Sequence, residues 1–119
     1  MTPPDVQLGL MLDLPENWDG YGADRIDPAV VEVAQEFVRL LTAIRRSDDL
    51  YVAPGRDGGV GVEWEEPGTR YSLDVNPDGT MQLLRVCKAS GAMTTERFDP
   101  KQLVSAASMF GAVRRLVAA

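Results

Sequence analysis

The spacing of apolar residues changes near residue 50, and this change constrains the fold more than any other feature. Over residues 28–46, apolar side chains recur every three or four positions, the period of a helix with one buried face. From Leu50 to residue 98 they alternate with polar residues, the period of a half-buried strand. The sequence therefore predicts helices followed by a sheet, which is the α+β class.

Three helices are predicted. The first covers residues 5–14 and stops before a proline, which cannot continue a helix. The second covers residues 28–46. Asp27 can cap it, and Pro28 suits the first helical position, where the missing N–H is not needed. The same Asp-Pro pair precedes the third helix, over residues 100–117.

Turn signals divide residues 50–98 into four to five short strands. Each signal contains glycine, and they lie at Pro54-Gly55, Asp57-Gly58-Gly59, Pro67-Gly68, Asn76-Pro77-Asp78-Gly79 and Ser90-Gly91. Turns this short join neighbouring antiparallel strands, so we expect a meander. The strand over residues 81–88 is apolar at both parities, which predicts a central strand covered on both faces and a buried Cys87.

The predicted order is α-α-β-β-β-β-β-α, in a single α+β domain over residues 1–119. Helices 28–46 and 100–117 are expected to cover one face of the antiparallel sheet, which gives a two-layer sandwich. The other face is expected to meet water or a partner. It would carry Glu63, Glu65, Ser72, Asp74 and Gln82.

The chain contains no histidine, and this excludes several classes of site. Ser-His-Asp catalysis, Cys-His catalysis and histidine-bound zinc all need an imidazole. A single cysteine also excludes an internal disulfide and a multi-cysteine metal site. We therefore predict a non-enzymatic protein with no catalytic residues, no metal site and no cofactor.

The net charge of -6 is unevenly distributed. The first 80 residues hold 16 acidic and 6 basic residues, whereas the last 39 hold 2 acidic and 6 basic residues. The structural interpretation is that acidic and basic strands lie beside each other in the fold. An acidic surface could also imitate nucleic acid and block a DNA- or RNA-handling complex, as an anti-CRISPR-like inhibitor does. Direct nucleic-acid binding is not expected of a chain that is acidic overall.

The sequence contains no apolar run of about 18 residues, the length needed for a membrane span. Its first residues lack the basic segment that begins a secretory signal. With one cysteine, these features predict a cytoplasmic protein without membrane association.

The segment Asn17-Trp18-Asp19-Gly20-Tyr21-Gly22-Ala23 is the most concentrated candidate site. Trp18 and Tyr21 are of the types that anchor protein interfaces. Asn17 and Asp19 could instead bond the backbone of a tight turn, which would make the segment architectural. The two interpretations remain open here.

Acidic residues of two neighbouring strands form a second candidate. Glu63, Glu65, Glu66 and Asp74 would gather if these strands pair, and Glu63 and Glu65 share a face. Such a patch could bind a partner, and the alternative is a carboxylate-based metal binder or enzyme. No known metal-binding spacing supports that alternative.

Residues 14–23, which read LPENWDGYGA, resemble a family of small uncharacterised bacterial proteins with an NWDGYGA-type loop before a long helix. The same family has a DGGxxxEW strand, matched by residues 57–64, and a later Asp-Gly turn, matched by residues 78–79. The resemblance covers residues 8–80. It implies a shared architecture and a bacterial or phage origin, and it implies no catalytic residues.

These features together predict a protein-interaction module, a small bacterial or phage regulator or inhibitor that binds a partner protein. The predicted partner-binding residues lie in the loop and on the sheet: Asn17, Trp18, Asp19, Tyr21, Glu63, Glu65 and Asp74. A homodimer formed through the small residues of the last predicted helix is a further alternative.

Overall fold

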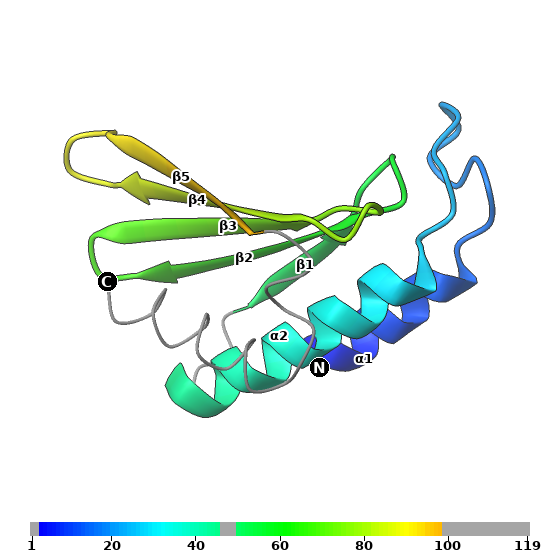
Figure 1. The fold of residues 1–119 in the computed structure, drawn as a ribbon, viewed down its shortest axis with the longest axis horizontal. Coiled ribbons are helices and arrows are strands. Elements are labelled where there is room, and N and C mark those ends of the chain that lie inside the picture. Colours follow the sequence, from blue (N-terminus) through cyan, green and yellow to red (C-terminus); the bar gives the residue numbers. More distant parts are fainter. Residues whose placement is uncertain (1–2, 46–49, 99–119) are drawn as a thin grey trace.

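The computed structural model describes residues 3–45 and 50–98, which form two helices packed against a five-stranded sheet (Figure 1). Helix α1 (Pro4–Leu10) continues into a short 3-10 helix, η1 (Met11–Asp13), and a long loop leads to α2 (Pro28–Arg45). The strands are β1 (Tyr51–Pro54), β2 (Val60–Glu66), β3 (Thr69–Val75), β4 (Met81–Cys87) and β5 (Met93–Phe98). The predicted α+β class is confirmed. The predicted last helix, residues 100–117, lies outside the described residues.

The sheet is an antiparallel meander in which every strand pairs with its neighbour in sequence, in the order β1-β2-β3-β4-β5. The turns between strands contain the predicted glycines. Gly68, Gly79 and Gly91 all adopt positive φ, a conformation that glycine reaches without steric cost. Short turns of this kind allow only antiparallel neighbours, so the turn signals determine the topology.

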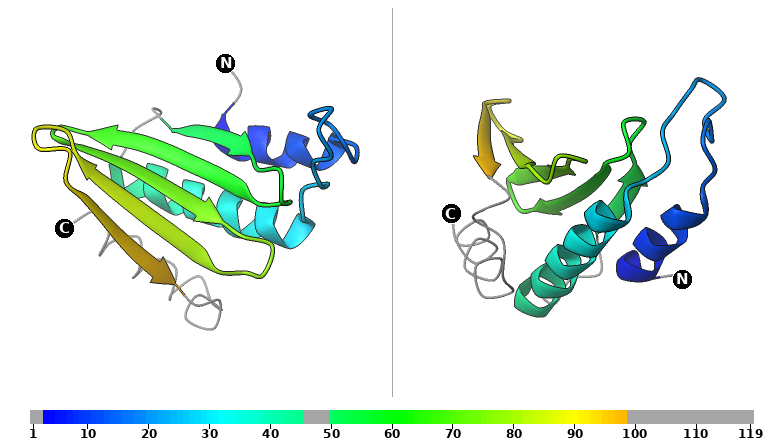
Figure 2. Two further views of the ribbon diagram at one scale, coloured as in Figure 1. Left: turned by 90° about the horizontal axis from the view of Figure 1, so that it is seen from above. Right: turned by 45° about the vertical axis from the view of Figure 1, so that its right-hand side comes forward.

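Helix α2 begins where the sequence indicates. The side chain of Asp27 accepts a hydrogen bond from the Ala29 N–H at 2.9 Å, and its carbonyl accepts one from the Val31 N–H at 3.1 Å. These bonds satisfy backbone donors that have no partner inside the first turn. Helix α1 lies beside α2, joined by a bond of 2.9 Å from Gln35 Nε2 to the Asp5 carbonyl. Both helices lie on the same side of the sheet (Figure 2).

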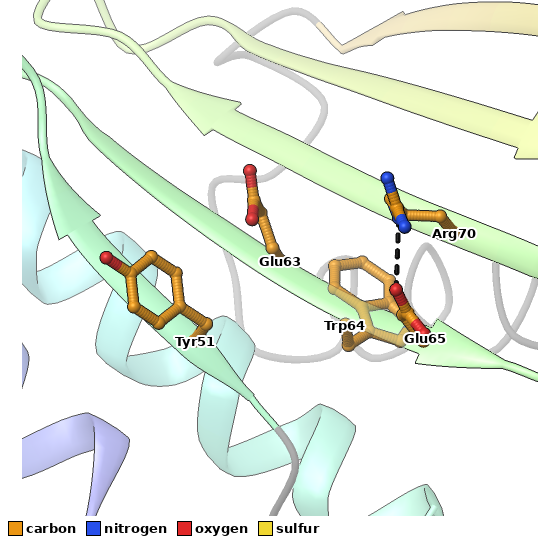
Figure 3. A pocket seen from close by; sticks show the side chains of 5 residues that line it. All are labelled: Tyr51, Glu63, Trp64, Glu65 and Arg70. Carbon is orange, nitrogen blue, oxygen red and sulfur yellow. Dashed lines mark hydrogen bonds and ion pairs between the residues drawn. The ribbon is translucent and has the colours of Figure 1, made fainter.

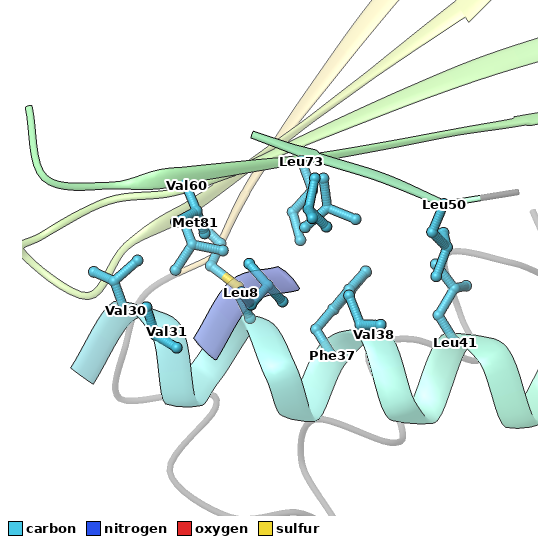
Figure 4. Packing of buried hydrophobic residues seen from close by; sticks show 14 of the residues in the cluster. Leu8, Val30, Val31, Phe37, Val38, Leu41, Leu50, Val60, Leu73 and Met81 are labelled. Atoms are coloured by element: carbon cyan, nitrogen blue, oxygen red, sulfur yellow. The ribbon is translucent and has the colours of Figure 1, made fainter. Parts of the chain in front are cut away.

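The core lies between the helices and the sheet (Figure 4). Helix α2 contributes a stripe of apolar residues, and β2 and β3 contribute every second residue. The Trp64 ring stacks on Tyr71 with centroids 5.0 Å apart, and Phe37 of α2 lies 5.7 Å away on a tilted ring. The largest fully buried side chains are Trp64, Phe37, Leu8, Leu41, Leu73, Leu83, Val31, Val62 and Val75. The sheet face on which the strand residues of this list lie is its inner face.

Strand β4 differs from its prediction in one respect. It lies between β3 and β5, but the Cys87 side chain is exposed, not buried. Cys87 is the last residue of the strand, and the buried core residues of β4, Met81 and Leu83, lie nearer its other end. Leu84, on the opposite (outer) face, is only half-buried. Apolar residues at both odd and even positions of a strand therefore do not require that both of its faces are covered.

Within residues 3–45 and 50–98, no helix combines the length and the apolar character that crossing a bilayer requires.

Candidate functional site

The loop between η1 and α2 extends from one end of the molecule, beside the turn that joins β1 and β2 (Figures 1 and 2). It contains the first candidate site, residues 17–23. Asn17 has a φ of 62°, and among the described residues it is the only non-glycine residue with positive φ. Gly20 and Gly22 have φ of 78° and 86°. Three left-handed residues fold this segment back on itself, which explains the placement of its asparagine and glycines.

Asn17 closes the segment with its backbone and with its side chain. Its N–H donates to the Ala23 carbonyl at 2.7 Å, and its Oδ1 accepts from the Gly22 N–H at 2.6 Å. The Gly20 N–H also donates to the Asn17 carbonyl, at 3.0 Å. Ala23 is buried at the base of the loop. The backbone N–H, the carbonyl and the Oδ1 of Asn17 are thus used within the loop.

Asp19 also holds the segment in place, through both of its carboxylate oxygens. Its Oδ1 accepts from the backbone N–H groups of Tyr21 at 2.8 Å and Ala23 at 3.1 Å. Its Oδ2 lies 2.7 Å from Nε of Arg56, which belongs to the turn between β1 and β2. The Asp19 side chain is only 15% exposed. The bond from Tyr21, with those from Ala23 and Arg56, lowers the pKa of Asp19 below its ordinary value.

The two aromatic residues of the loop have different environments. Trp18 is half-buried, and its Nε1 donates to the Asp24 carbonyl at 3.0 Å. Tyr21 is 81% exposed, the most exposed of the large apolar side chains in the described residues. Its carbonyl accepts a hydrogen bond from Nη2 of Arg56. The loop therefore buries part of one ring and holds the other in solvent.

The loop is fastened to the sheet through the turn after β1. The N–H of Asp24 donates to the Arg56 carbonyl at 2.8 Å, and that of Asp27 to the Gly58 carbonyl at 3.0 Å. A Cβ on Gly58 would lie 3.0 Å from the Arg25 carbonyl oxygen. Only glycine allows the turn and the loop to approach this closely.

The same turn is packed against the turn between β3 and β4. A Cβ on Gly59 would lie 2.5 Å from the carbonyl oxygen of Val75, and one on Gly58 would lie 3.6 Å from Pro77. The loop at residues 17–23 and the turns at residues 55–59 and 76–79 therefore meet at one end of the sheet. We call this meeting point the loop joint.

The second candidate site lies on the outer face of the sheet. A hollow of about 520 Å³ opens there, lined by Tyr51, Glu63, Trp64, Glu65 and Arg70 (Figure 3). Tyr51 of β1 is directly opposite Glu63 of β2 and is 64% exposed. The Trp64 ring is buried in the core, so this residue can line the hollow only near its backbone.

Glu65 is engaged by two cations. Its Oε1 lies 3.0 Å from Nε of Arg70, directly opposite on β3, and its Oε2 lies 2.9 Å from Nζ of Lys88. These hydrogen bonds, that from Lys88 first, lower the pKa of Glu65. A strand period of two puts Glu66 on the inner face, away from Glu63 and Glu65. The sequence placed Glu66 in the same acidic patch, and this placement was wrong.

Asp74 lies near Glu63 on the outer face, but not directly opposite it. Its Cα partner on β2 is Gly61, whereas the partner of Glu63 is Ser72. Partial burial, together with the negative charge of Asp57, raises the pKa of Asp74. Within the described part of the chain, no group of three or more Asp, Glu, Cys or His residues is arranged to hold a metal ion.

The predicted site residues therefore fall into two groups. Asn17, Trp18, Asp19 and Tyr21 belong to the loop, near the end of β1 that leads to Arg56. Glu63, Glu65 and Asp74 share the outer face of the sheet. Sequence analysis missed Arg56 and Tyr51. The signal for Tyr51 was its position, one residue from the buried Val52 and thus on the opposite face.

Comparison of the chain with protein-family models, curated proteins and solved structures gives no match to any of them.

Proposed function

We propose that this chain is a non-enzymatic protein-interaction module, a small bacterial or phage regulator or inhibitor, which binds its partner through the loop at residues 17–23. The observation that carries the proposal is Tyr21, an aromatic side chain 81% exposed on a loop held by its own hydrogen bonds. Exposed tyrosine on a fixed backbone loses little conformational entropy on binding, which favours its use as an interface anchor.

The roles of the other loop residues follow from their contacts. The Oδ1 of Asn17 and the carboxylate of Asp19 already bond the loop and Arg56, so these residues position Tyr21. Trp18 is half-buried and supports the loop from below through its bond to Asp24. In this proposal, Tyr21 contacts the partner, and the neighbouring residues hold the loop in the conformation that exposes Tyr21. The outer-face residues Glu63, Glu65 and Asp74 form a secondary contact.

The proposed setting is the cytoplasm, where thiols remain reduced. The exposed Cys87 thiol and the lack of a second cysteine suit such a compartment.

The test is affinity capture with the full chain immobilised, using an extract of the organism that encodes it and quantitative mass spectrometry. Tyr21→Ala should reduce the captured partner by about tenfold or more, as at an interface hot spot. Leu10→Ala is the matched control, because Leu10 is an apolar side chain 56% exposed on α1, outside the loop at residues 17–23. Its capture should equal that of the wild type.

Glu63→Gln examines the secondary contact and should cause a smaller loss than Tyr21→Ala. Thermal unfolding of each variant shows that the fold is retained. If Tyr21→Ala captures the same proteins in the same amounts as the wild type, the loop has an architectural role only and the proposal is rejected.

A further inference from the structure

The two edge strands of the described sheet differ in how open they are to another strand. Strand β1 has four residues and ends in Pro54, which has no N–H to donate. Strand β5 has six residues, Met93–Phe98, with no proline or lysine. Among the described residues, no strand pairs with its far side (Figure 2). An edge of six residues without proline or lysine is less protected against pairing with another strand than β1 is.

The hydrogen-bond pattern of the sheet shows which backbone groups of β5 point away from β4. In antiparallel pairs, residues directly opposite alternate between bonded and non-bonded pairs. The N–H of Cys87 donates to the Ala92 carbonyl at 2.9 Å, which makes these two residues a bonded pair. Counted from this pair, every second residue along β4 and β5 belongs to a bonded pair. Thr94 and Glu96 thus bond β4, whereas Met93, Thr95 and Arg97 direct their N–H and C=O groups outward.

A second observation gives the same alternation. The N–H of Lys88 donates to the Gly68 carbonyl at 3.0 Å, so even-numbered residues of β4 bond β3. The odd-numbered residues of β4 are then left to bond β5, as the first observation requires.

We propose that β5 pairs with β5 of a second copy of this chain, antiparallel and centred on Thr95. This arrangement joins two five-stranded sheets into one continuous sheet, with both outer faces on the same side. Three pairs would be bonded: Met93 with Arg97 of the second copy, Thr95 with Thr95, and Arg97 with Met93. Each pair can exchange two backbone hydrogen bonds.

The charges of β5 select this centre over its neighbours. Only the outward-directed residues of β5 can bond those of the second copy, so the two-fold axis of a symmetric pair must pass through a residue and not between two residues. The candidate centres are Thr94, Thr95 and Glu96. Centring on Glu96 would place the two Glu96 carboxylates opposite each other, and like charges directly opposite are destabilising. Centring on Thr94 pairs fewer residues of β5. Centring on Thr95 places Thr94 opposite Glu96 and brings no like charges together.

Amide hydrogen exchange of the full chain, followed by NMR at increasing concentration, tests the register without mutation. Thr94 and Glu96 should be protected at every concentration, because their N–H groups bond β4. The N–H groups of Met93, Thr95 and Arg97 should become protected only as the chain concentration rises toward about 1 mM, the range of a weak complex. Protection that does not depend on concentration would overturn the proposal.

Charge variants measure the same register by analytical ultracentrifugation. Met93 is 67% exposed and lies opposite Arg97 of the second copy, so Met93→Glu should strengthen dimerisation and Met93→Lys should weaken it. Each effect occurs twice in the symmetric dimer, and we expect about threefold to tenfold in the dissociation constant. Leu10→Lys, at an exposed position of α1, is the matched control and should leave the dissociation constant unchanged.

Two further outcomes would reject the proposal: a chain that remains monomeric at about 1 mM, or Met93→Glu and Met93→Lys variants that shift the dissociation constant in the same direction. Neither outcome bears on Tyr21, because β5 and the loop at residues 17–23 are different surfaces. The proposed dimer and the proposed partner binding can therefore fail separately.

Discussion

Asp19 Oδ2 lies 2.7 Å from Nε of Arg56, and this ion pair links the loop at residues 17–23 to the turn after β1. The same carboxylate caps two backbone N–H groups of its own loop through Oδ1. One side chain thus closes the loop and attaches it to the sheet. The conformation that exposes Tyr21 depends on both functions.

Asp19→Asn should lower the melting temperature at pH 7, and the difference from the wild type should shrink in acid. The folded pKa of Asp19 lies below its ordinary value of 3.8. The carboxylate therefore stabilises the fold above that value, and this stabilisation is lost as the pH falls through the folded pKa. Thermal unfolding between pH 7 and pH 2 checks the prediction. Asp24→Asn, in the same loop, is the control, and an equal effect there would contradict the prediction.

Asp74→Asn should have the opposite sign and raise the melting temperature at pH 7. Burial and the charge of Asp57 raise the folded pKa of Asp74, so its ionised form is a penalty to the fold. This penalty is complete above the folded pKa and disappears as the pH falls below the unfolded value. The gain should therefore vanish near pH 3. Glu63→Gln removes the same charge from the same face and should give a smaller gain.

Gly59→Ala should destabilise the fold by about 2 kcal/mol or more, because the new Cβ would overlap the Val75 carbonyl oxygen at 2.5 Å. Gly61→Ala, two residues later, has ordinary space, since its Cβ would lie 3.7 Å from the nearest atom, of Asp74. It should change the free energy of unfolding by no more than about 0.5 kcal/mol. Urea denaturation separates the two variants, and equal values would contradict the close packing of the loop joint.

Trp64→Ala should cost about 3–5 kcal/mol, because it removes the ring that stacks on Tyr71 and contacts Phe37. Trp64→Phe should cost only about 1–2 kcal/mol. Phenylalanine keeps a ring in place, and the buried Trp64 Nε1 has no hydrogen-bond partner among the described residues, so its removal loses no bond. Urea denaturation followed by circular dichroism measures both. A Phe variant as unstable as the Ala variant would disprove this account of the indole.

The elements of the fold were predictable because each has a local cause. The helical stripe, the Asp27 cap and the glycine turns act within a few residues, so α2 and the strand pairs follow from the sequence. The exposed Cys87 was not predictable from its apolar neighbours. Its exposure depends on where the core ends along β4, which is a property of the assembled layers.

The candidate site was predictable only in part, for the same reason. The loop at residues 17–23 is visible in the sequence, and the architectural interpretation of Asn17 and Asp19 agrees with their contacts. The role of Arg56 depends on how a distant turn packs, and nothing near Asp19 in the sequence indicates it. The partners of Glu65 likewise depend on strand register, which places Arg70 and Lys88 beside it.

The loop joint has a consequence for how the exposed tyrosine could be copied. The loop's own hydrogen bonds, within residues 17–23, are supplemented by a turn that comes much later in the chain. The Arg56 guanidinium bonds Asp19 and the Tyr21 carbonyl, and the carbonyls of Arg56 and Gly58 bond Asp24 and Asp27. A synthetic peptide with only these seven residues lacks that template and would sample many conformations. A partner that binds Tyr21 would then recognise a conformational epitope, and transplanting the loop to another scaffold would require the turn at residues 55–59 as well.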